Sequence, residues 1–130
     1  MPLTWTISDA DRLVSARAEG AITLKEIESM FDEIVVRNAL GYRKLFDSRG
    51  STGTYDDKDV MSLGARIQAY VGLDKLTGAA AIVVEGPKQY NVAVRFANIA
   101  KGRRPIQVFY TLEEARAWLD TDPKLSESVI

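Results

Sequence analysis

The pattern at the start of the chain is that of a strand with one buried face. Apolar side chains at positions 3, 5 and 7 alternate with polar ones at positions 4, 6 and 8, which is the two-residue period of a half-buried strand. Asp9-Ala10-Asp11 then supplies a turn, and residues 13–18 read as a second strand that ends at Gly20. We therefore expect an antiparallel hairpin.

The following segment changes to helical spacing. Thr23-Leu24-Lys25-Glu26 is a capping box, in which the Thr23 hydroxyl accepts from the amide of Glu26 and the Glu26 carboxylate reaches back. Apolar residues at positions 24, 27, 31 and 34 follow on one face. We expect this helix to run to about Ala39 and to stop near Gly41.

Strands and helices alternate through the rest of the chain. Strands are expected at 43–47, 79–85 and 106–110, and the second of these is apolar almost throughout, as in a strand covered on both faces. Helices are expected to begin near Asp56 or Asp57, at Pro87, and at a second capping box, Thr111-Leu112-Glu113-Glu114. The polar stretch 47–57 is predicted to be the longest loop.

The order of these elements predicts the fold class. They follow one another as ββαβαβαβα, which indicates an α/β domain with a mostly parallel sheet and an antiparallel edge hairpin. The 130 residues suit a single domain. We assign it to residues 1–121 and expect residues 122–130 to form a polar C-terminal tail.

The charge balance and the absence of Cys and His exclude several classes of function. The 17 Lys and Arg residues nearly balance the 18 Asp and Glu residues, which argues against a nucleic-acid partner. The chain has no Cys and no His, so thiolate zinc sites, iron–sulfur clusters, Cys nucleophiles and Ser-His-Asp triads are excluded. We expect neither a metal nor a cofactor.

The sequence carries no targeting or membrane signal. The first residues have no basic region followed by an apolar stretch. No apolar run approaches the roughly 20 residues that a membrane span needs. These features predict a cytoplasmic protein that is not an integral membrane protein.

A candidate site is expected where the parallel strands end, because ligands of open α/β sheets bind beyond the carboxyl ends of the strands. If the third and fourth strands are neighbours, the segments after Asp47 and after Glu85 share one rim. Hydroxyls, amides and two helix N-termini would meet there, which suits an anion or a phosphate. The candidate ligand- or partner-binding residues are Asp47, Arg49, Ser51, Thr52, Tyr55, Asp56, Asp57, Glu85, Lys88 and Tyr90.

These residues also have structural interpretations. Asp56 and Asp57 suit a helix N-cap and first turn. Asp47 suits a side chain that anchors the following turn, and Glu85 with Lys88 suits a surface ion pair. An enzyme is an alternative function, with a carboxylate as general base and with Asp47 and Glu85 as an acid pair.

The order of elements and two short motifs resemble a known family. Residues 47–50, Asp-Ser-Arg-Gly, end a predicted strand, and residues 115–119, Ala-Arg-Ala-Trp-Leu, lie in the last predicted helix. Over about residues 5–120 the chain resembles the bacterial SpoIIAA-like proteins, described as STAS/SEC14-type domains. The resemblance implies the βα fold of anti-sigma-factor antagonists, a likeness to CRAL-TRIO lipid-transfer domains, and no established catalytic activity.

The resemblance also implies a place for a phosphorylation switch. In the antagonists a kinase phosphorylates a serine in an Asp-Ser-Ser/Thr-Gly motif after the third strand. Counting from Asp47, this motif would fall at Tyr55-Asp56-Asp57-Lys58, where aspartates and a lysine stand in place of serine and glycine. The switch is therefore not carried over to this chain.

Together, the resemblance and the composition favour a non-catalytic binding or regulatory module. It would engage a protein partner, or a small lipophilic or anionic ligand, at the strand-end rim. Carriage of a lipid would require a cavity beneath the second or third helix. A structural homodimer is a further alternative, which an exposed apolar strip would favour.

Overall fold

The five predicted strands form one sheet whose spatial order follows the order of the chain. The computed structural model describes residues 2–52, 57–74, 78–100 and 105–121, and its strands pair in the order β1-β2-β3-β4-β5. They are β1 (Leu3–Ser8), β2 (Leu13–Gly20), β3 (Arg43–Ser51), β4 (Ala80–Val83) and β5 (Ile106–Phe109). β1 and β2 pair antiparallel and the other pairs are parallel, as predicted. The predicted tail, 122–130, lies outside the described residues.

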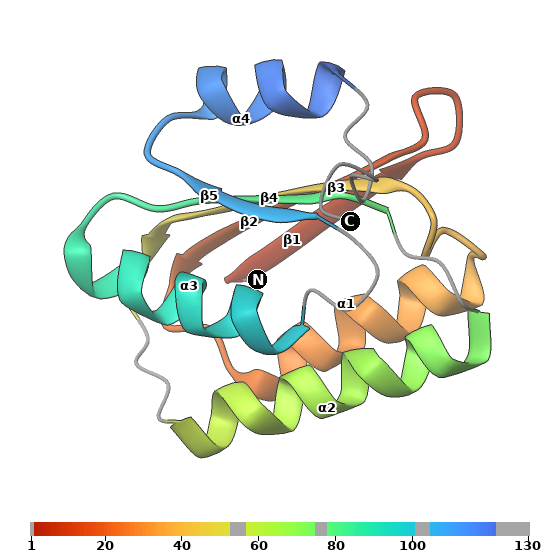
Figure 1. Ribbon diagram of the computed structural model, residues 1–130, viewed down its shortest axis with the longest axis horizontal. Helices are drawn as coiled ribbons and strands as arrows, with labels where there is room; N and C mark the ends of the chain where they lie inside the picture. Colours follow the sequence, from red (N-terminus) through yellow and green to blue (C-terminus); the bar gives the residue numbers. More distant parts are fainter. Residues whose placement is uncertain (1, 53–56, 75–77, 101–104, 122–130) are drawn as a thin grey trace, which may run out of the picture.

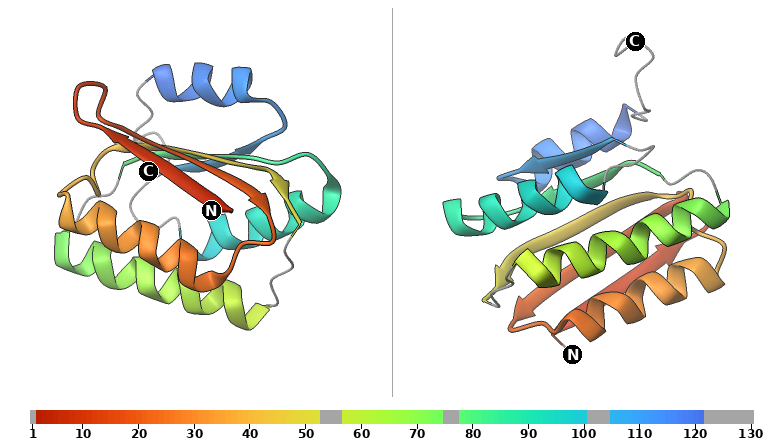
Figure 2. Two further views of the ribbon diagram at one scale, coloured as in Figure 1. Left: turned by 180° about the vertical axis from the view of Figure 1, so that it is seen from behind. Right: turned by 60° about the horizontal axis from the view of Figure 1, so that its bottom comes forward.

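Helices cover both faces of the sheet. The helices α1 (Leu24–Val36), α2 (Asp57–Asp74) and α3 (Pro87–Ala100) lie on one side, and α4 (Leu112–Asp120) lies on the other (Figure 1). α2 packs mainly against α1 and α3 rather than on the sheet, and it lies between them in the right-hand view of Figure 2. The architecture confirms the predicted single α/β domain.

Local signals set the start of α1 more accurately than its end. The Thr23 hydroxyl accepts from the Glu26 amide at 3.1 Å, and the Glu26 carboxylate accepts from the Thr23 amide at 3.1 Å. The predicted capping box is therefore formed. The helix ends at Val36 and does not reach Ala39. The reason is Asn38, whose φ of 56° is left-handed and which tolerates this conformation better than most residues.

β3 is longer than the sequence predicted. The strand was expected to end at Asp47, with a loop from there to Asp57, but it continues to Ser51. Its pairing with β2 shifts register and resumes at Gly50 and Ser51. A Cβ at Gly50 would lie 3.1 Å from the carbonyl oxygen of Ala18, so the glycine permits a close approach of the two strands.

β4 is buried on both faces, as its apolar sequence predicted. Ala81 and Val83 pack with Leu119 of α4 on one side, and Ile82 packs with Ala93 of α3 on the other. A further apolar cluster joins α1 to β1 and β2. The sheet therefore separates two apolar layers.

Candidate binding sites on the two faces of the sheet

A cavity of about 790 Å³ lies between the sheet and helices α1, α2 and α3. We call it the helix-side cavity. Its wall is mostly apolar and includes Val14, Ile27, Phe31, Phe46, Val92 and Phe96. The space that lipid carriage would require is therefore present beneath α2 and α3.

The cavity follows from the way the elements pack. Alternation along β3 turns Lys44, Phe46 and Ser48 to this face of the sheet. The apolar stripe of α1 faces the same space. Because α2 rests mainly on its neighbouring helices, its Leu63 lines the cavity from the side opposite the sheet.

The carboxyl ends of β3 and β4 form a polar mouth to this cavity, and hydrogen bonds fix its shape. Gln89, in the first turn of α3, accepts from the Glu85 amide at 3.1 Å and donates to the Ser51 carbonyl at 2.9 Å. The Ser48 hydroxyl donates to the carbonyl of Val83 at 2.7 Å. These bonds tie the two strand ends to the start of α3.

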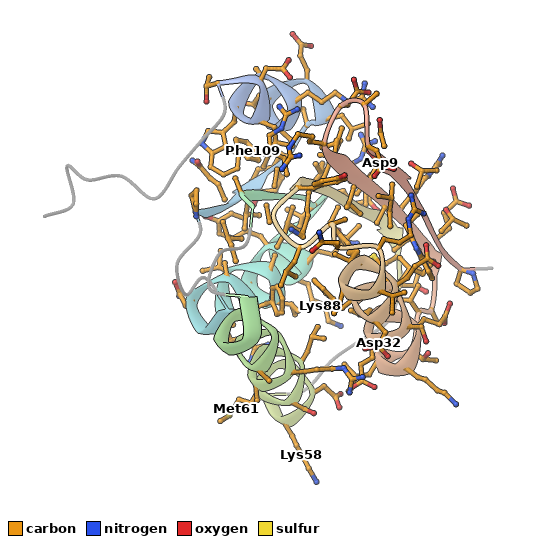
Figure 3. All side chains as sticks on the ribbon, turned by 90° about the vertical axis from the view of Figure 1, so that its right-hand side faces the viewer. Asp9, Asp32, Lys58, Met61, Lys88 and Phe109 are labelled. Carbon is orange, nitrogen blue, oxygen red and sulfur yellow. The ribbon has the colours of Figure 1, made fainter. Side chains whose placement is uncertain are left out.

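Two charged side chains, Glu85 and Lys88, are exposed at the mouth. Their spacing suited a surface ion pair, but within the described part of the chain neither forms one. In Figure 3 Lys88 lies between the ribbons of α1 and α3, and it is one of the residues that line the cavity. Its ammonium is a cation that can bind a polar group at the mouth of the cavity.

A second lysine, Lys44, is buried in the cavity wall with 7% exposure. Its ammonium donates to the carbonyls of Leu40 at 2.6 Å and Tyr42 at 2.7 Å. These carbonyls replace water around the charge, as a buried ammonium requires. We therefore assign Lys44 a structural role at the end of the α1–β3 connection.

The predicted rim is divided between the two faces of the sheet. β3 and β4 are neighbours, as the prediction required. However, Asp47 and Arg49 line a groove on the α4 side, whereas Ser51, Thr52 and the two mouth charges line the helix-side cavity. The segments after Asp47 and Glu85 do meet at one rim, as predicted. The side chains of Asp47 and Arg49 nevertheless lie on the other face, because the pairing of β3 with β2 shifts register between Asp47 and Gly50.

Asp47 and Arg49 form a two-point ion pair. Arg49 Nε lies 2.9 Å from Asp47 Oδ1, and Nη2 lies 2.9 Å from Oδ2. Asp47 is 9% exposed and also accepts from the Arg49 amide at 3.2 Å. The sequence suggested that Asp47 anchors a turn, but this bond lies within β3. The hydrogen bonds from the guanidinium lower the pKa of Asp47, outweighing the opposing effect of burial, and the same pairing raises the pKa of Arg49.

The other candidate residues divide between described and undescribed parts of the chain. Asp57 begins α2, within the predicted range. Tyr55 and Asp56 lie outside the described residues. Tyr90 is exposed and stacks on Tyr110, with ring centroids 5.5 Å apart and planes at 5°.

Sequence reasoning missed Gln89, Ser48 and Lys44 as site residues. Gln89 is the third residue of a helix that Pro87 opens, a position from which a polar side chain reaches back to the preceding backbone. The role of Gln89 could therefore have been predicted from its position in the sequence. Nothing in the sequence indicates the acceptors of Lys44, because they come from the connection that precedes its own strand.

Two further properties of the described residues concern metal binding and membrane crossing. The described residues contain no group of three His, Cys, Asp or Glu that could hold a metal ion. Among them, no helix combines the length and apolarity that a membrane crossing demands.

Comparison with known proteins establishes the fold. No family model and no curated protein matches the chain. A solved structure does: an uncharacterized DUF3478-family protein with a SpoIIAA-like fold from Shewanella loihica PV-4. The identity is 18%, the match covers 90% of this chain and 91% of that chain, and the TM-score is 0.56. The chain therefore has a SpoIIAA-like fold, as the resemblance implied.

Proposed function

We propose that this protein with a SpoIIAA-like fold is a non-catalytic binding module, and that its helix-side cavity binds a small lipophilic ligand. The observation that carries the proposal is the helix-side cavity of about 790 Å³. Small-molecule sites are typically concave, mostly apolar and roughly 300–1,000 Å³ in volume, with a few placed polar groups. The cavity has each of these properties.

The ligand class follows from the distribution of polar groups. The apolar wall favours a hydrocarbon or ring system, because its burial contributes roughly 25 cal/mol per Å². The hydroxyls of Ser51 and Thr52 and the ammonium of Lys88 stand at the mouth. Glu85 lies there too, so a bare anion gains little from the local charge. A molecule with a long apolar body and one polar end fits this arrangement best.

Two features support a non-catalytic role. The chain has neither His nor Cys. The carboxylate pair suggested for an enzyme, Asp47 and Glu85, does not share a cavity, and Asp47 is held by Arg49. We propose that ligand binding serves a regulatory or carrier role in the cytoplasm.

One observation favours a protein partner as a second candidate. The stacked Tyr90–Tyr110 pair is exposed, with Tyr90 in the first turn of α3 and Tyr110 directly after β5. Exposed tyrosines are frequent anchors of protein interfaces, since they bury a large area and carry a polar tip. A pull-down from the host lysate with wild type and Tyr110→Ser, in which only the wild type retains a discrete protein, would support this candidate.

The test of the leading proposal is native mass spectrometry of the protein purified from its own host, followed by solvent extraction. We expect a discrete added mass that extraction releases as a lipophilic compound. The same spectrum reports a homodimer, if one forms. Purified protein is then titrated with the fluorescent fatty acid cis-parinaric acid.

A matched pair of variants assigns the binding to the cavity. Val92→Trp places a bulky ring in the cavity wall, whereas Val36→Trp makes the same change at a position that is 83% exposed. We expect the first to abolish saturable cis-parinaric acid binding and the second to retain it. Equal binding by both folded variants, or a bare apo mass together with no saturable probe binding, would refute the proposal.

A further inference from the structure

We propose that the groove between α4 and the outer face of β1, β2 and β3 is a second binding site, for a small anion that carries a phosphate or carboxylate group. We call it the α4 groove. It has a volume of about 400 Å³ and is lined by three arginines, Arg17, Arg49 and Arg116. It lies on the opposite face of the sheet from the helix-side cavity, so it is independent of the proposed function.

The groove exists because α4 covers only part of its face. α4 packs on β3, β4 and β5, and in Figure 1 it stands alone above the sheet. The outward side chains of β1 and β2 therefore line an open floor next to it. The strand registers place Thr4 opposite Arg17, and Arg17 opposite Asp47. A row of polar side chains thus crosses three strands towards the flank of α4.

Arg49 is a fixed donor in this row. Its Nε and Nη2 donate to Asp47, so the planar guanidinium is held in one orientation and its Nη1 group is left for another acceptor. A guanidinium held in place loses less conformational entropy when an anion binds. In this arrangement Asp47 is a positioning residue, and Arg49 contacts the ligand.

Arg17 and Arg116 are the other two arginines that line the α4 groove. Arg116 follows Leu112 by one turn on the flank of α4 that faces the groove, and in the described part of the chain it forms no ion pair. Arg17 pairs with Glu19 at 2.6 Å, but both side chains are more than half exposed. Such pairs contribute little in water, so Arg17 can exchange this partner for a ligand.

Hydroxyl groups supply neutral donors on the groove floor. Thr4, Thr6 and Ser15 line it, and none of the three hydroxyls has a hydrogen-bond partner among the residues that the structure describes. Three guanidiniums face one lining carboxylate, Asp47, which is already neutralised. Guanidinium groups match phosphate and carboxylate with paired hydrogen bonds, and the small volume suits a small molecule.

The test is a titration of ¹⁵N-labelled protein with inorganic phosphate and, separately, with citrate, each at constant ionic strength set with sodium chloride. We expect saturable shifts in the Nε–Hε signals of Arg17, Arg49 and Arg116. Tighter binding of phosphate identifies a phosphate ligand, and tighter binding of citrate identifies a carboxylate. Shifts spread over all arginines, or no saturation with either anion, would overturn the proposal.

Three variants test the location of the site. Arg116→Gln should weaken binding about tenfold through loss of a charge-assisted hydrogen bond, whereas Arg37→Gln, which removes the same charge elsewhere, should leave it within about twofold. Asp47→Asn separates positioning from bulk charge: it adds a positive charge to the groove, yet binding should weaken because Arg49 is released. Equal effects of the two arginine variants, or tighter binding by Asp47→Asn, would contradict the assignment.

Discussion

Asp47 and Arg49 stand two residues apart on β3 and hold each other on the face of the sheet away from α1, α2 and α3, through two contacts of 2.9 Å. A spacing of two places both side chains on one face of a strand. The two side chains of the Asp-x-Arg unit can therefore bind each other directly, without a residue from another element. Its carboxylate is almost buried while its guanidinium stays partly exposed, so the pair has consequences for both stability and recognition.

The first prediction concerns the pH dependence of stability. Hydrogen bonds from Arg49 lower the pKa of Asp47 in the folded state, below the ordinary value of about 3.9 in the unfolded chain. The resulting stabilisation is present above that unfolded value and is lost as pH falls through the lower folded pKa. Urea unfolding should show a constant difference between wild type and Asp47→Asn from about pH 5 to 7, which shrinks below about pH 4. A difference that grows in acid would contradict this.

The second prediction concerns Glu26, which joins α1 to the edge strand β1. Its carboxylate accepts from the amide of Thr23 at 3.1 Å and from the amide of Leu3 at 3.4 Å. Glu26→Ala should cost about 1–2 kcal/mol of unfolding free energy, since one cap and one edge hydrogen bond are lost. It should also speed hydrogen exchange at Leu3. The exposed neighbour Lys25 is the control, and a Lys25→Ala variant of equal stability loss would sink the interpretation.

Much of the fold was predictable because its signals are local. The Thr23 capping box needs only four adjacent residues, and it formed as predicted. The alternation in residues 3–8 gave β1 and its pairing. The length of β3 was not predictable in the same way. Residues 48–51 have the composition of a loop, and their pairing with β2 decides their conformation.

The candidate site was only partly predictable for a related reason. The strand-end rule pointed to the ends of β3 and β4, which form the mouth of the helix-side cavity. A loop was expected after Asp47, so the register shift that puts Arg49 and Ser51 on opposite faces was not foreseen. The helix-side cavity depends on where α2 rests, and that is decided by contacts with α1 and α3. No single segment of the sequence encodes such a volume.

The third prediction concerns Gly78, which lies next to the start of β3. A Cβ at this position would overlap the carbonyl group of Tyr42, and that carbonyl also accepts from Lys44. Gly78→Ala should therefore destabilise the fold by about 3 kcal/mol through overpacking of backbone atoms. Gly41 has open space around its Cβ position, so Gly41→Ala should stay within about 0.5 kcal/mol of wild type. Chemical denaturation measures both, and similar values would contradict the steric argument.

The fourth prediction concerns Gln89 at the mouth of the helix-side cavity. Its amide group connects the Glu85 backbone to the Ser51 carbonyl, so it fixes the ends of β3 and β4 relative to α3. Gln89→Ala should cost about 1 kcal/mol and increase hydrogen exchange at the Glu85 amide, which loses its acceptor.

A matched control separates this local effect from a general loss of stability. Gln107, an exposed residue of β5, offers the same side chain without a position at the mouth, so Gln107→Ala should leave exchange at Glu85 unchanged. If Gln89 fixes the mouth, Gln89→Ala should also release bound cis-parinaric acid faster than Gln107→Ala does. Unchanged exchange at Glu85 in a folded Gln89→Ala variant would show that the side chain does not hold the mouth.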